Sequence, residues 1–143
     1  MSGNHIPEKY IDDYLKETEA PFTKQEFYNS VQHLVPLTYG EDNRVIGFIG
    51  LDIFPSQYLK ENVPVLKIMY IDPPERRPTV FRESVRIVFN ALKKQGFRRV
   101  EIHANKKINN WLRRELHSKP YHYIHLQDID FYCDQMNKDI EGD

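Results

Sequence analysis

The sequence predicts a single-domain α/β (α+β) fold in which helices flank a mixed, mostly antiparallel sheet. Its 143 residues suit one domain. Turn residues at 40–43 separate two apolar stretches, which favours an antiparallel hairpin. Farther along, an apolar stretch, a long amphipathic stretch and a second apolar stretch follow one another. This order is typical of two parallel strands joined by a right-handed helical crossover.

Two helices are expected before the sheet. Pro7 suits the first position of a helix that extends to Thr18, with apolar residues at helical spacing along it. The second helix should begin after Thr23, because Glu26 follows three residues later and completes a capping box.

Six strands and two further helices complete the prediction. A long helix over 78–95 should end at Gly96 in a left-handed cap, and a short helix should cover 108–117. Gly47 and Gly50 interrupt an apolar strand, which indicates a bulge or a close backbone approach. The expected strands are residues 35–39, 44–54, 63–71, 98–104, 121–126 and 129–133.

Composition limits the class of protein. The single cysteine, Cys133, excludes an internal disulfide, and no apolar run approaches the roughly 20 residues that span a bilayer. We therefore expect no membrane association and a cytoplasmic protein, or one assembled into a virus particle inside a host cell. Residues 1–134 are expected to form the domain, and residues 135–143 an acidic, flexible tail.

Charge is distributed unevenly along the chain. Residues 60–120 carry 15 Lys and Arg against 6 Asp and Glu, a net charge of +9, whereas residues 1–59 and 121–143 are each −5. A basic middle indicates an anionic ligand, an acidic partner surface or compensation within the molecule. All three interpretations stay open at this stage.

Three segments resemble the GNAT superfamily of N-acetyltransferases, over roughly residues 22–132. The stretch LKIMYIDPPERR at 66–77 is similar to the family's fourth strand and the start of its acyl-CoA loop. The stretch QGFRRVEI at 95–102 is similar to the end of its long helix and its fifth strand. Asn109, followed by a helix and an aromatic strand, resembles its closing motif.

The resemblance implies acyl transfer from acetyl-CoA to an amine. In the family, backbone amides at a helix N-terminus bind the pyrophosphate, and glycines allow its close approach. Here Arg77 matches the leading basic residue, but larger residues stand where the glycines are expected, and Pro78 has no amide hydrogen. The implied cofactor-binding residues are Met69, Tyr70, Ile71, Arg76, Arg77, Thr79, Arg82 and Asn109.

Three residues are candidates for proton transfer. Glu101 and His103 alternate onto one side of a strand and could take a proton from the amine; the alternative is a polar sheet face satisfied by its neighbours. His117 would stand near the family's leaving-group acid if the alignment shifted by one residue. We expect no metal site, because His122 and His125 would point to opposite faces of a strand.

Two other functions compete with the enzyme. The altered loop is consistent with a pseudoenzyme, a structural or interaction protein that kept the fold, similar to acetyltransferase-like proteins of tailed bacteriophages that serve as virion or assembly components. The basic region 60–120 would then contact a protein partner. Nucleic-acid binding ranks lower, since the sequence has no recognised nucleic-acid motif.

Overall fold

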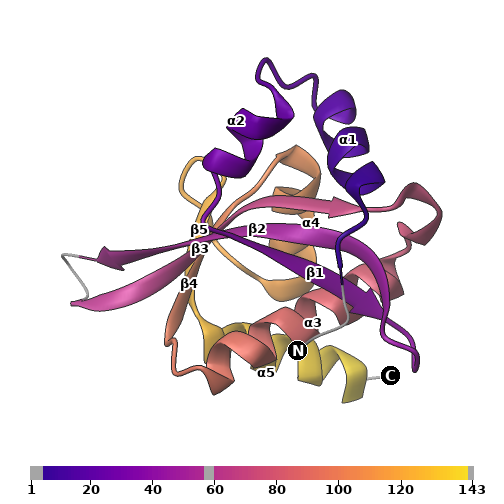
Figure 1. Cartoon of the computed structure of the whole chain (residues 1–143). Coiled ribbons are helices and arrows are strands. Elements are labelled where there is room, and N and C mark those ends of the chain that lie inside the picture. Colours follow the sequence, from indigo (N-terminus) through magenta and orange to yellow (C-terminus); the bar gives the residue numbers. More distant parts are fainter. Residues whose placement is uncertain (1–4, 57–59, 142–143) are drawn as a thin grey trace.

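A computed structural model describes residues 5–56 and 60–141, with side chains up to residue 137. It contains one five-stranded mixed sheet in the order β1-β2-β3-β4-β5 (Figure 1). Every neighbouring pair is antiparallel except β3 and β4, which are parallel. The strands are β1 (His33–Tyr39), β2 (Arg44–Ser56), β3 (Glu61–Ile71), β4 (Arg99–His103) and β5 (Ile124–Asp128). The predicted hairpin and crossover are therefore confirmed.

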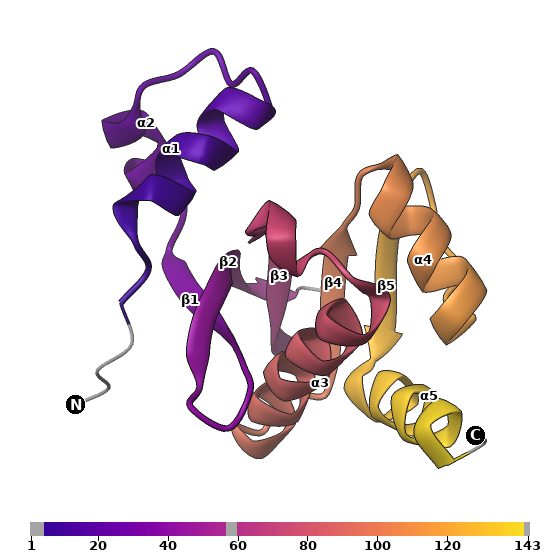
Figure 2. The same cartoon turned by 90° about the vertical axis from the view of Figure 1, so that its right-hand side faces the viewer.

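Helices cover both faces of the sheet. Figure 2 shows α3, α4 and α5 in front of one face, with α1 and α2 to the other side. None of the described helices is long and apolar enough to cross a membrane. The helices are α1 (Glu8–Glu17), α2 (Lys24–Asn29), the 3-10 turn η1 (Pro73–Glu75), α3 (Pro78–Lys94), α4 (Lys106–Leu116) and α5 (Ile129–Glu141).

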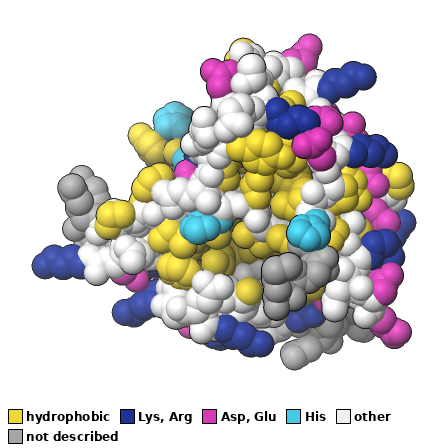
Figure 3. Space-filling view, viewed as in Figure 1, with side chains coloured by type: hydrophobic (Ala, Val, Ile, Leu, Met, Phe, Trp, Pro, Cys, Tyr) yellow, Lys and Arg dark blue, Asp and Glu magenta, His cyan; other side chains and the backbone are white. Residues whose placement is uncertain are grey.

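Each face of the sheet has its own apolar core. The main core joins the sheet to α3, α4 and α5, and it includes Val88, Leu112 and Tyr132. The second core lies under α1 and α2, around Phe27 and Phe48. Figure 3 shows apolar side chains gathered over the middle of the molecule beside these two helices, with charged side chains mostly around the rim.

The predicted local signals appear in the structure. Thr23 accepts a hydrogen bond from the Glu26 amide (3.1 Å), and the Glu26 carboxylate accepts one from the Thr23 amide (2.8 Å), which completes the capping box of α2. Gly96 has φ +93°, the left-handed conformation expected after α3.

The two strand glycines mark close approaches between β2 and β3. A Cβ added to Gly47 would lie 2.0 Å from the Tyr70 carbonyl oxygen, and one added to Gly50 would lie 2.8 Å from Ile68 Cβ. The register shifts at Gly50, where Lys67 of β3 is left without a partner in β2. Both a bulge and a close approach are thus confirmed.

The strand predicted over 129–133 is wrong, because these residues begin helix α5. Ile129, Tyr132, Cys133 and Met136 are all buried, and their spacing of i, i+3, i+4 and i+7 is helical. The predicted strand stopped at Cys133, so it left out Met136, the residue that makes the helical spacing visible. The backbone of residues 135–141 continues this helix. The domain boundary and the flexibility predicted for residues 135–143 stay predictions, and residues 142–143 lie outside the described residues.

Candidate functional site

Strand β4 presents two unlike faces. Val100 and Ile102 are buried in the main core, which also contains Leu112 and Leu116 of α4. Since side chains alternate along a strand, Glu101 and His103 project from the opposite face, away from α4. The chain therefore separates an apolar side from a polar side on one short strand.

Glu101 and His103 are brought together on that polar side. His103 Nε2 lies 2.5 Å from Glu101 Oε2, and the side chains are 42% and 30% exposed. Their cross-strand neighbours on β5 are Ile124 and Leu126, both exposed. The pair is accessible to a ligand, and its role in proton transfer stays a prediction.

The β3 segment beside this pair is irregular. The ladder between β3 and β4 contains two register pairs, Val65 with Glu101 and Leu66 with Ile102. The next residue is the bulged Lys67, whose ammonium contacts the Asp52 carboxylate and donates to the Ser30 carbonyl oxygen (2.7 Å).

Asp52 is a buried carboxylate at this bulge. Burial acts to raise its pKa, but the Gln32 amide, at 2.8 Å, and the Lys67 ammonium together hold the pKa of Asp52 below its usual value. The bulge is thus fixed by a charged contact between β2 and β3.

The start of α3 keeps part of a phosphate-binding arrangement. Arg77 occupies the N-cap position without a side-chain capping bond, and Pro78 is the first helical residue. Thr79 follows and is exposed, so its amide lies in the first turn, where a helix has unsatisfied donors. The Arg77 side chain is 57% exposed and contacts Glu75 at 3.3 Å.

Arg76 is directed elsewhere. Its guanidinium donates to both carboxylate oxygens of Glu17 in α1 (2.8 and 2.9 Å) and to the Ile71 carbonyl oxygen (2.7 Å). It also lies 5.3 Å from the centre of the Tyr70 ring. Arg76 therefore links α1 to the end of β3, and does not extend toward a ligand.

Two further residues at this end of the molecule have structural contacts. Glu75 is held between Arg44 (3.0 Å) and Arg77, so it orders the loop. Arg82 lies 3.3 Å from Glu115 and 5.7 Å from the Trp111 ring centre, both in α4. The Phe81 and Trp111 rings also meet at 4.5 Å, which joins α3 to α4.

The predicted residues of β3 contribute side chains to the cores. Met69 packs against the main core, and Ile71 is buried within it. Tyr70 is buried in the second core, where burial, then Asp13 and Asp72, raise the pKa of its phenol to about 12. Tyr70 and Ile71 would therefore meet a cofactor through their backbone, whereas the Met69 side chain is only partly buried.

Asn109 belongs to a buried polar network that the sequence analysis missed. Its Oδ1 lies 2.8 Å from His125 Nε2, and His125 Nδ1 lies 2.7 Å from Ser118 Oγ. The Ser118 hydroxyl also meets the Tyr132 hydroxyl at 2.9 Å. Burial, and then the nearby Arg113, lower the pKa of His125. The available signal was Asn109 itself, a polar residue between the apolar positions of α4.

His117 stands apart from the Glu101–His103 pair. It is the C-cap of α4, exposed, with φ +55°. Because α4 packs on the opposite side of β4, the structure does not bring the three candidate residues into one site. Among the described residues, no cluster of three or more His, Cys, Asp or Glu side chains could hold a metal.

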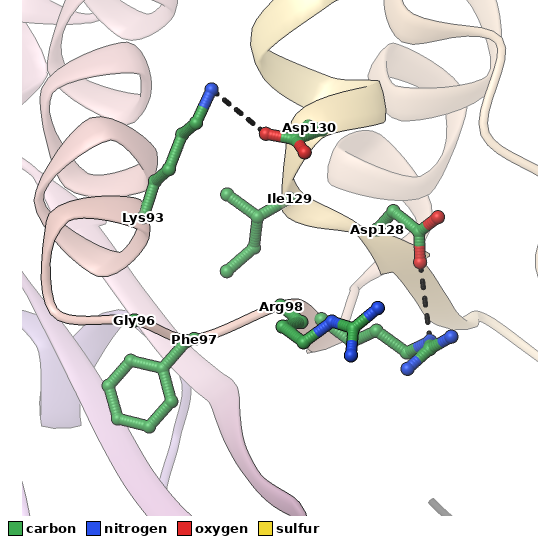
Figure 4. Close-up of a pocket in the computed structure, with 8 residues that line it drawn as sticks. Lys93, Gly96, Phe97, Arg98, Asp128, Ile129 and Asp130 are labelled. Atoms are coloured by element: carbon green, nitrogen blue, oxygen red, sulfur yellow. Dashed lines mark ion pairs between the residues drawn. The ribbon is translucent and has the colours of Figure 1, made fainter.

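A pocket lies at the C-terminal end of α3 (Figure 4), and none of the predicted site residues lines it. It lies between the end of α3 and the junction of β5 with α5, around Gly96, Phe97 and Ile129. Ion pairs between Lys93 and Asp130 (2.9 Å) and between Arg99 and Asp128 (3.2 Å) flank it. Four of its charged side chains are thus paired with one another, whereas Arg98, which also lines the pocket, is in neither pair.

Comparisons with known proteins agree on one family. The model of the acetyltransferase (GNAT) family matches residues 4–118. A comparison with curated protein sequences found no significant match.

Solved structures resemble the fold. A probable acetyltransferase has 13% identity and a TM-score of 0.59, covering 79% of this chain and 86% of its own. A Trypanosoma brucei acetyltransferase has 16% identity and a TM-score of 0.55, with coverages of 80% and 86%. An aminoglycoside acetyltransferase from an uncultured soil sample, in complex with sisomicin, has 14% identity and a TM-score of 0.54, covering 78% of each chain.

At these identities the solved structures support the fold alone, whereas the match to the family model supports membership of the family. The expected likeness to tailed-bacteriophage proteins gains no support from these matches. Because the family model covers most of the chain, the protein belongs to the GNAT acetyltransferase family.

Proposed function

We propose that this protein transfers an acetyl group from acetyl-CoA to a primary amine, with the Glu101–His103 pair as the proton acceptor. The observation that carries the proposal is the contact between these side chains on an exposed sheet face. Family membership supports the donor. The expected protein partner and the cellular location stay predictions.

The residues at the start of α3 fit a phosphate group in part. The helix begins without a side-chain cap, and the positive end of its dipole favours an anion there. Arg77 and the Thr79 amide would hold the cofactor phosphates, since Arg76 is bonded to Glu17. When bound, acetyl-CoA would supply a thioester that is open to attack by an amine.

The protein's own side chains would manage the proton. An amine attacks only after it loses its ammonium proton, and that proton needs an acceptor within hydrogen-bond reach. If the neutral His103 ring donates its Nε2 hydrogen to Glu101, then Nδ1 keeps a lone pair that can accept the proton. Glu101 would orient the ring and stabilise the imidazolium that forms.

Kinetics on variants would test this role. With a panel of primary amines and acetyl-CoA, we expect His103→Gln and Glu101→Gln each to lower kcat by about 10²- to 10⁴-fold, the usual contribution of a positioned base. Asp128→Asn is the matched control, because Asp128 lies on the same exposed sheet face and pairs with Arg99. Equal rates in all three variants would show that neither side chain accepts the proton.

A second function, a GNAT fold without turnover, is favoured by the start of α3. Pro78 lacks an amide hydrogen, Arg76 is held by Glu17, and Phe81 packs against Trp111 of α4. In that case the purified protein would bind no acetyl-CoA at millimolar concentration, and a macromolecular partner would be the object of the search.

A further inference from the structure

The solvent-facing side of α4 is strongly cationic. We define the α4 basic face as Lys106, Lys107, Asn110, Arg113 and Arg114, which are all exposed and lie on one side of the helix. The opposite side of α4, with Asn109, Leu112 and Leu116, is buried. We propose that this face, together with the loop that follows α4, binds single-stranded nucleic acid.

The cations of this face are largely unpartnered. Lys106, Lys107 and Arg113 form no ion pair with any residue that the structure describes, and the same holds for Lys119 just beyond the helix. Arg114 alone contacts an acid, Glu115 at 3.0 Å. Lys106 and Lys107 also lie in the first turn of α4, where the positive end of the helix dipole disfavours cations, so a bound anion would stabilise this end of the helix.

The following loop places aromatic rings next to these cations. The Ser118 amide donates to the Leu112 carbonyl oxygen (3.1 Å), and the Ala104 amide donates to the Tyr123 carbonyl oxygen (3.1 Å). The loop therefore runs back along α4 from its C-terminal to its N-terminal end. Tyr121 is 77% exposed and Tyr123 is 46% exposed, which is unusual for such large rings.

The loop holds the rings outward at the cost of local strain. His122 and Tyr123 have φ of +50° and +66°, a conformation that side chains other than glycine seldom adopt. Two hydrogen bonds between Tyr121 and Ile124, each 2.9 Å, maintain this turn. Strain of this kind is concentrated at functional sites.

A single strand of nucleic acid satisfies both features. Its phosphates would lie along α4, whose 11 residues extend about 16 Å, and its bases would stack on Tyr121 and Tyr123. An acidic peptide would match the cations but leave the rings exposed, and a duplex would keep its base faces hidden. The cations of α4 lie on the opposite side of the sheet from Glu101 and His103, and only the loop at Tyr123 borders that pair, through its bond to Ala104. The inference does not depend on the proposed acetyl transfer.

Fluorescence anisotropy with a labelled 12-nucleotide oligouridylate would measure binding between 50 and 200 mM salt, conditions chosen for the steep salt dependence of such contacts. With three or four phosphates neutralised, the plot of log binding constant against log salt should have a slope of about −2 to −3. Replacing Lys106 and Arg113 together by Ala should make the slope shallower by about 1.4. Lys94→Ala, which removes an exposed cation of α3, should leave it unchanged.

The stacking contribution has its own variant. Tyr121→Ala should weaken binding by about 5- to 100-fold without changing the salt slope. The proposal is overturned if oligoglutamate of equal charge binds as tightly, if a 12-base-pair duplex competes equally well, or if neither the Lys106 and Arg113 variant nor Tyr121→Ala affects binding. Unchanged melting temperatures would show that the variants fold.

Discussion

The start of α3 and the outer side of α4 both concentrate positive charge, but the two regions differ in what surrounds the charge. At the start of α3, Arg76 is bonded to Glu17, Arg77 contacts Glu75, and Arg82 contacts Glu115. On α4, Lys106 and Arg113 have no acidic partner within the described residues.

A count of the cations in a segment is therefore not enough to identify an anion-binding site, because acids from elsewhere in the fold can pair with them. Acids of α1, the loop and α4 each contact one of the arginines that sequence similarity assigns to cofactor phosphates. In contrast, α4 carries its cations on a face with a single nearby acid, Glu115. Of the three interpretations of the basic middle of the chain, compensation within the molecule fits Arg76 and Arg82. An anionic ligand is proposed at Arg77 and at α4, and an acidic partner surface stays a prediction.

The largest expected effect comes from a substitution that forces β2 and β3 apart, next to the start of α3. Gly47→Ala would place a Cβ 2.0 Å from the Tyr70 carbonyl oxygen, so the backbone of β2 or β3 must move. We expect a loss of more than about 4 kcal/mol in the free energy of unfolding, because overpacking against a fixed backbone is among the few mechanisms that destabilise a protein this much. Urea denaturation would measure it.

Gly96→Ala is the matched control, because a Cβ at Gly96 would meet nothing within 4 Å. There the left-handed φ alone should cost about 1–2 kcal/mol. Similar losses for the two variants would contradict the close approach at Gly47.

A smaller effect compares the two cationic regions directly. Arg76→Ala removes the bonds to Glu17 and Ile71 and the contact with the Tyr70 ring, so we expect a loss of about 1–2 kcal/mol. Arg113→Ala should change stability by less than about 0.5 kcal/mol in either direction. If Arg113→Ala were the more damaging change, the contrast drawn between α3 and α4 would be reversed.

How far the sequence predicted these regions depends on the range of the contacts. Local signals were sufficient for the capping box at Thr23 and the cap at Gly96, since each depends on neighbouring residues. The crossover was predicted from the strand–helix–strand order and the usual topology of such units. The partners of Arg76 and Asn109 could not be predicted, because Glu17 and His125 come close only through tertiary packing. The helical spacing of α5 is present in the sequence, but it becomes clear only when Met136 is included with residues 129–133.

The smallest expected effect is a pH dependence of stability that arises from His125, which contacts Asn109 on the buried side of α4. Because the pKa of His125 is lowered in the folded protein, the unfolded chain binds a proton more readily. This contribution to stability is complete above pH of about 6.5, the ordinary pKa of histidine, and declines as the pH falls from there toward the lowered folded value. Melting temperatures between pH 8 and pH 5 should show the decline.

Asn109→Asp would sharpen that test. A carboxylate beside His125 Nε2 favours the imidazolium and raises its folded pKa, so the decline toward pH 5 should become shallower. Identical pH profiles for the natural protein and this variant would show that His125 does not control the dependence.

The central claim, that this GNAT protein binds acetyl-CoA at the start of α3, is tested most directly by thermal denaturation with acetyl-CoA, beside ADP as a phosphate control. At about 100 times its dissociation constant a ligand adds roughly 2.7 kcal/mol of stability, or about 5–10 °C in a domain of this size. We predict such a rise, reduced by Arg77→Ala and kept when Lys106 and Arg113 are replaced by Ala. No rise at millimolar acetyl-CoA, or a rise abolished only by the α4 substitutions, would contradict the claim.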